Sequence, residues 1–133
     1  MKCTDTGDFF QAWGGISSLQ LGLPILWTKL SARKYSLAHL ARWMSSGPAR
    51  LAGLEKHKGA IAAGYDADIV VWNPEKRFTV QPKMLHHRHK LTPYLNESLL
   101  GVVEATFLGG EMIYDRGRFL GKPRGALLRR GKR

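Results

Sequence analysis

The stretch Gly59-Ala-Ile-Ala-Ala-Gly-Tyr-Asp-Ala-Asp-Ile-Val-Val-Trp-Asn-Pro74 decides how this chain is organised. It joins a glycine turn, a short acidic turn and an apolar strand in one order. Gly64 can adopt a positive φ without a steric clash, and Asp66 can accept a backbone N–H in the turn. The β-branched and aromatic run Ile69 to Trp72 predicts a buried strand, and Pro74 is expected to stop it.

Helical patterns precede this stretch. The Gly14-Gly15 turn leads into a first helix, in which Pro24 is positioned to kink or divide the chain. Ser36 is suited to cap a second helix, which is expected to end at Ser45-Ser46-Gly47. Pro48, at a first helical position, then opens a short third helix. The apolar residues at helical spacing are Ile16, Leu19, Leu23 and Leu26 in the first pattern and Leu37, Leu40, Ala41 and Met44 in the second.

Short β patterns follow residue 58. Apolar runs punctuated by glycine and proline predict strands around 69–72, 78–80, 102–108 and 111–114, and Gly109-Gly110 predicts a tight hairpin between the last two. We therefore divide the chain into a helical part (1–58), a β part (59–122) and a basic tail (123–133). The β part contains a histidine-rich loop at 81–100.

Length and charge exclude several classes of protein. The 133 residues fall far short of the roughly 250 of a complete (β/α)₈ barrel, and no apolar run approaches the ~18 residues of a membrane span. The formal charge is +11, yet residues 116–133 alone hold eight Lys or Arg and no acid. A small basic nucleic-acid-binding protein is therefore one alternative, although no nucleic-acid-binding motif accompanies the charge. Cys3 is the only cysteine, which, with no secretory signal in evidence, favours an intracellular setting.

Several segments carry a resemblance to one family. These are Trp13–Gln20, Gly22–Trp27, Ser46–Leu54, the stretch quoted above, His86–Tyr94 and Ala105–Gly109. Together they resemble the allantoinases, which are cyclic amidohydrolases of the amidohydrolase superfamily, and the similarity extends from Gly7 to Leu128. It implies an α+β fold: the C-terminal helices of an incomplete metal-dependent (β/α)₈ amidohydrolase barrel, followed by part of a flanking β-sandwich.

The resemblance also implies an activity for the complete enzyme. Allantoinases hydrolyse the cyclic amide of allantoin to allantoate in purine catabolism, using a binuclear zinc or similar divalent metal centre, and we expect the complete enzyme to form a homo-oligomer. The family's metal ligands belong to barrel segments that are absent from this sequence. We therefore assign no catalytic and no metal-binding residue here and expect no activity from this chain alone. We expect Met1 to be an internal methionine, or an artificial start, within a longer reading frame. A noncatalytic scaffold similar to dihydropyrimidinase-like proteins is a second alternative.

Two other patterns suggest metal or acid–base chemistry. His87-Arg88-His89 has the His-x-His spacing of metal ligands, but it follows the quoted stretch and has no strand of its own, so we assign it to a loop that packs on the barrel. Asp66-Ala67-Asp68 could form a carboxylate pair. We expect Asp66 to fasten the turn and Asp68 to begin the strand.

One substrate-binding site is predicted, at Gly14, Gly15, Ile16 and Ser17. In related ring-opening amidohydrolases this segment offers backbone groups to the amide edge of the substrate, and glycine lets the backbone approach closely. The alternative is that these residues form only a turn leading into the helix.

Overall fold

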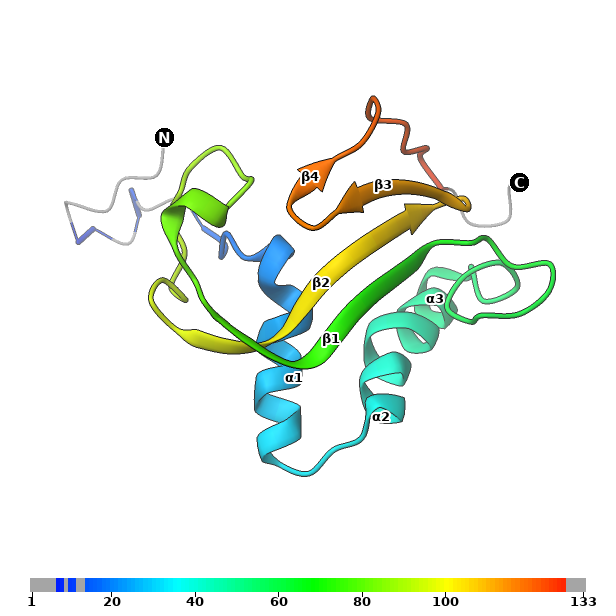
Figure 1. Cartoon of the computed structure of the whole chain (residues 1–133), viewed down its shortest axis with the longest axis horizontal. Helices are drawn as coiled ribbons and strands as arrows, with labels where there is room; N and C mark the ends of the chain where they lie inside the picture. The colour runs from blue at the N-terminus through cyan, green and yellow to red at the C-terminus, as the bar shows by residue number, and fades with distance from the viewer. Residues whose placement is uncertain (1–6, 9, 12–13, 129–133) are drawn as a thin grey trace.

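The chain forms a four-stranded antiparallel sheet preceded in sequence by a set of helices (Figure 1). The computed structural model describes residues 7–8, 10–11 and 14–128. Helical segments occupy the first part of the described chain and strands the second. The predicted α+β class is therefore confirmed.

The first helical segment starts later than its sequence pattern indicates. A 3₁₀ turn, η1 (Leu19–Leu21), leads into α1 (Gly22–Ala32). Ile16 and Leu19 lie before α1 and are 65% and 99% exposed, so the expectation that they share its buried face is wrong. Pro24 lies in the first turn of α1, where the missing N–H has no intrahelical partner to lose, and the helix continues to Ala32 without division.

Ser36 caps the next helix as predicted. The helix α2 (Leu37–Ala41) begins directly after it, and the backbone N–H of Ser36 donates to Nδ1 of His39 at 3.3 Å. Leu40, one of the predicted apolar positions, is 4% exposed. The capping residue and one buried position of this helix were therefore readable from the sequence.

The predicted helix end at Ser45-Ser46-Gly47 is wrong. A π-helical turn, η2 (Arg42–Ser46), connects α2 directly to α3 (Gly47–Ala52), and Pro48 lies in the first turn of α3. A Cβ at Gly47 would lie 2.7 Å from the carbonyl oxygen of Arg42. The glycine thus permits the tight backbone approach of the π turn instead of breaking the helix.

The sheet is a meander with strand order β1-β2-β3-β4. Gly109 and Gly110 connect the second and third strands with φ of +58° and +84°, as a two-residue type I′ hairpin requires, and Leu108 pairs with Glu111 across the turn. The predicted hairpin is confirmed. The strands are β1 (Ile69–Thr79), β2 (Ser98–Leu108), β3 (Glu111–Asp115) and β4 (Arg118–Phe119).

Pro74 does not stop β1. The strand continues to Thr79 because a bulge between Asn73 and Arg77 takes the proline out of the ladder. Asn73 Oδ1 accepts the backbone N–H groups of the two residues after Pro74 at 2.9 and 3.1 Å. The two short strands expected on either side of the proline are therefore one strand with an irregularity.

Helix α1 is fastened to the sheet at this bulge. Trp27 Nε1 donates to the Pro74 carbonyl at 2.9 Å, and its ring meets the Trp72 ring edge-on at 5.7 Å. Thr28 Oγ1 accepts the backbone N–H of Leu100 in β2 at 2.8 Å. The two side chains thus provide hydrogen-bond partners for a backbone carbonyl and a backbone N–H next to the irregular part of the β1–β2 ladder.

The most deeply buried cluster lies where η1, the strand ends and the histidine-rich loop meet. It consists of Leu21, Val80, Leu85 and Leu99, each no more than 1% exposed. The loop between β1 and β2 includes a short 3₁₀ turn, η3 (Pro82–Met84), directly before Leu85. The loop thus contributes Leu85 to the core. Among the described helices, none is long and apolar enough to cross a membrane.

Candidate functional site

The predicted substrate turn lies on the surface just before η1. Gly15 has φ of +89°, which favours glycine. A Cβ built at either Gly14 or Gly15 would meet nothing within 4 Å. Ile16 is 65% exposed and Ser17 is half-buried. A side chain at either glycine would therefore point into open space. Trp13 lies outside the described residues.

The turn is followed at once by a side-chain bridge that sequence patterns did not reveal. Gln20, in η1, donates from Nε2 to the carbonyl of Met84 at 2.8 Å, and its Oε1 accepts the backbone N–H of His86 at 2.9 Å. Its neighbour Leu21 packs in the core cluster with Leu85. The segment that carries the turn is thereby held against the histidine-rich loop, more than 60 positions away in sequence.

The histidines of that loop make structural contacts. The His86 ring packs edge-on against Phe119 of β4, with ring centroids 4.7 Å apart. His87 Nε2 lies 3.3 Å from the carbonyl oxygen of Leu91 within the same loop. Two of the three histidines therefore connect the loop to itself and to the sheet.

The described residues do not fit the binuclear metal centre that the resemblance implies. Nowhere within them do three His, Cys, Asp or Glu side chains come close enough to share a metal ion. A catalytic zinc ion takes about three protein ligands. No chemical step through a metal can therefore be assigned to these side chains.

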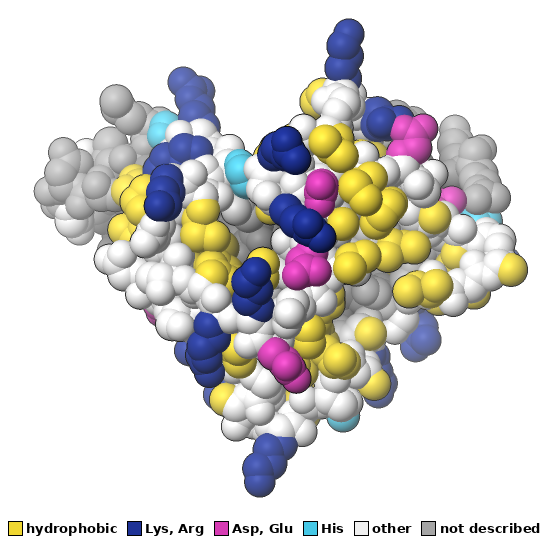
Figure 2. All heavy atoms as spheres, viewed as in Figure 1, with side chains coloured by type: hydrophobic (Ala, Val, Ile, Leu, Met, Phe, Trp, Pro, Cys, Tyr) yellow, Lys and Arg dark blue, Asp and Glu magenta, His cyan; other side chains and the backbone are white. Residues whose placement is uncertain are grey.

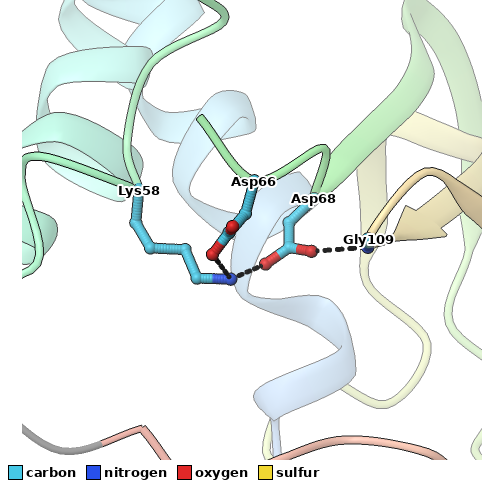
Figure 3. A network of polar contacts seen from close by, with 4 residues as sticks. All are labelled: Lys58, Asp66, Asp68 and Gly109. Carbon is cyan, nitrogen blue, oxygen red and sulfur yellow. Dashed lines mark hydrogen bonds and ion pairs between the residues drawn. The ribbon is translucent and has the colours of Figure 1, made fainter. Parts of the chain in front are cut away.

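The acidic turn forms a clasp, which we define as Lys58, Asp66, Asp68 and the backbone of Gly109 (Figure 3). Lys58 Nζ lies 3.0 Å from Asp66 Oδ2 and also donates to Asp68 Oδ2. Asp68 Oδ1 accepts the N–H of Gly109, at the β2–β3 hairpin, at 2.8 Å. The clasp connects the segment after α3, the start of β1 and the hairpin.

The clasp lowers the pKa of one of its carboxylates. The hydrogen bond from Lys58 holds the pKa of Asp68 below its ordinary 3.8, and the Gly109 N–H adds to this effect. The hydrogen bond to Asp68 in turn raises the pKa of Lys58 above 10.5. A general base needs a pKa near the working pH. Asp68 has the opposite property. It lies directly before β1, which begins at Ile69, and Asp66 forms an ion pair with Lys58, so both carboxylates have structural contacts, although the strand begins one residue later than expected.

Large apolar side chains remain uncovered on both the helical and the β part. Figure 2 shows hydrophobic side chains gathered over the sheet on the face viewed, around β2 and β3. Leu51 in α3 is 87% exposed and Ile61 88% exposed. These large apolar side chains are therefore accessible to solvent in the described structure.

Comparisons with known proteins agree with this architecture. An allantoinase from Streptomyces avermitilis is 51% identical over 125 residues, covering 94% of this chain and 28% of the relative. A probable allantoinase 2 from Dictyostelium discoideum is 48% identical over 111 residues, covering 84% of this chain and 22% of the relative.

Solved structures are also similar. A D-hydantoinase (dihydropyrimidinase) from Thermus sp. superimposes with a TM-score of 0.79 at 27% identity, covering 86% of this chain and 25% of that one. The chain thus spans about a quarter of the length of the proteins it matches. The model of the amidohydrolase family matches residues 29–114. This chain belongs to the amidohydrolase family.

Proposed function

We propose that this chain forms the carboxy-terminal helices and part of the flanking β-sandwich of an allantoinase. Its 51% identity to a bacterial allantoinase over 94% of its length carries the proposal. The complete enzyme would hydrolyse the cyclic amide of allantoin to allantoate. The division into a helical part (1–58), a sandwich part (59–122) and a basic tail (123–133) is part of the same proposal.

In the proposed enzyme, this chain contributes to substrate binding and the rest of the polypeptide holds the metal centre. The relatives are between three and four times as long as this chain, and the described residues hold no metal-ligand cluster. We therefore place the divalent metal centre, zinc or a similar ion, on segments outside this sequence. The exposed apolar residues, such as Leu51 and Ile61, are then surface that those segments would cover, which removes apolar area from water. A homo-oligomeric state belongs to the proposal for the complete enzyme.

Within this division, Gly14, Gly15, Ile16 and Ser17 would bind the substrate. The positive φ of Gly15 and the open space in front of both glycines support this assignment. Backbone N–H and C=O groups can pair with the amide edge of a hydantoin ring when no side chain intervenes. The turn would then orient the ring, and the chemistry would take place on the remainder of the enzyme.

The binding role of Gly14–Ser17 can be tested in a fusion protein. In this fusion, this chain replaces the matching 28% of the Streptomyces avermitilis allantoinase. Gly14→Val should reduce allantoin hydrolysis by about 100-fold, the effect that a displacement near 1 Å can have. A Cβ at Gly14 meets nothing within 4 Å in the structure, so the fold itself should tolerate the change. Gly22→Val is the matched control, because Gly22 also has open space and an ordinary φ of −55°.

A second control tests the histidines. His87→Ala should leave metal content and turnover unchanged, because His87 contacts only its own loop among the interactions described. If His87→Ala removed the metal while Gly14→Val had no effect, both assignments would be wrong.

A further inference from the structure

Gln20 has two hydrogen bonds to one stretch of backbone that is remote in sequence. Its Nε2 donates to the Met84 carbonyl at 2.8 Å and its Oε1 accepts from the His86 N–H at 2.9 Å. The carbonyl of Leu85, between them, accepts a hydrogen bond from Lys90 Nζ. A carboxamide has a donor and an acceptor side by side. It can therefore pair with the carbonyl of one residue and the N–H of the residue two positions later, as a neighbouring strand does.

The bridge fixes position more than it adds stability. The Gln20 side chain lies at the surface, where a hydrogen bond contributes only about 1 kcal/mol, and the Leu21–Leu85 packing beneath it provides the burial. Two bonds in opposite directions, however, allow only one alignment of η1 along the loop. Removing them should leave the core in place and free the surface segment to shift.

The segment that would shift carries the substrate turn. Gln20 follows Ser17 by three positions, and the backbone N–H of Leu21 donates to the Ser18 carbonyl at 2.9 Å. No regular helix or strand lies between Gly14 and Ser18. A change in the position of η1 would therefore move the Gly14–Ser17 turn, because only Ser18 separates the two segments.

From this geometry we propose that Gln20 is a positioning residue that sets the Gly14–Ser17 turn by bridging it to the histidine-rich loop. This inference rests on the proposed function of the turn. It assigns the loop a role in substrate orientation that needs no metal and no histidine chemistry.

Hydrogen–deuterium exchange on the 133-residue chain tests the coupling without any assay of activity. Gln20→Met keeps the side-chain length and removes both bonds. Exchange should rise about tenfold at the His86 amide and at the amides of 14–18, while the amide of Leu100 in β2 stays as in the parent. Gln20→Glu keeps the acceptor and should restore part of the protection at His86. If exchange at 14–18 did not respond to Gln20→Met, the coupling would be refuted.

The fusion protein tests the consequence for the substrate. Gln20→Met should raise the KM for allantoin about tenfold, with unchanged metal content. Gln81→Ala is the matched control, since this exposed glutamine begins the same loop and its side chain makes no cap hydrogen bond. An active parent whose KM is unchanged by Gln20→Met would overturn the inference. An inactive parent would instead refute the proposed function, and the exchange experiment alone would then decide whether Gln20 positions the turn.

Discussion

Replacing Gly101 by alanine should destabilise the fold through two separable effects. Gly101 has φ of +102°, a conformation that costs a residue with a Cβ about 1–2 kcal/mol. The new Cβ would also lie 2.8 Å from Trp72 Cζ3 and 3.1 Å from Cε3. Overpacking of this kind costs about 1–3 kcal/mol. The sum is about 3 kcal/mol, a large share of the ~5–15 kcal/mol by which domains are stable.

The matched variant Gly117→Ala separates the two effects. Gly117 has φ of +93°, yet a Cβ there meets nothing within 4 Å. The Gly117→Ala variant should therefore lose only about 1 kcal/mol of unfolding free energy, the cost of a positive φ for a residue with a Cβ. Urea unfolding followed by tryptophan fluorescence gives both free energies of unfolding. If Gly101→Ala cost no more than Gly117→Ala, the close packing of Gly101 against the Trp72 ring would be refuted as a source of the destabilisation.

Three further predictions concern hydrogen bonds and charge. Thr28→Val should cost about 1–3 kcal/mol in urea unfolding, because the N–H of Leu100 loses its acceptor; an unchanged midpoint would contradict this. Lys58→Met should cost about 1 kcal/mol at neutral pH. Since the pKa of Asp68 is lowered from 3.8 and that of Lys58 raised from 10.5, this cost should disappear as pH falls through the folded-state pKa of Asp68 or rises through that of Lys58; a difference that does not shrink as the pH is lowered from neutral to well below 3.8 would contradict the clasp. Binding of nucleic acid should be weak, independent of base sequence, absent by ~200 mM salt and abolished by deleting residues 122–133, as fluorescence anisotropy with an unrelated oligonucleotide can show; sequence-selective binding after the deletion would reveal a different surface.

Features of the fold that depend on neighbouring residues were readable from the sequence. Ser36 begins its helix, and Gly109-Gly110 forms the hairpin, because capping and positive φ are requirements of a few adjacent residues. The open turn at Gly14 and Gly15 belongs to the same class. Its role in binding substrate stays a prediction.

Features that depend on remote partners were not readable. The sequence predicted that Pro74 ends a strand, whereas Pro74 lies in a bulge within β1. Its carbonyl accepts a hydrogen bond from Trp27, 47 positions away. Gly47 looked like a helix breaker, and it allows a π turn against the Arg42 carbonyl. The bridge from Gln20 likewise has no local signature, because only the folded loop supplies its partners.

Allantoin turnover by the fusion protein tests the central proposal most directly. The bacterial relative is prepared without the 28% that this chain matches, alone and joined to this chain, and both are measured with the same bound metal. We expect no hydrolysis from the shortened relative or from this chain by itself, and hydrolysis proportional to protein concentration from the joined form. A joined form that folds and retains its metal, yet leaves allantoin intact, would contradict the proposal that this chain completes an allantoinase.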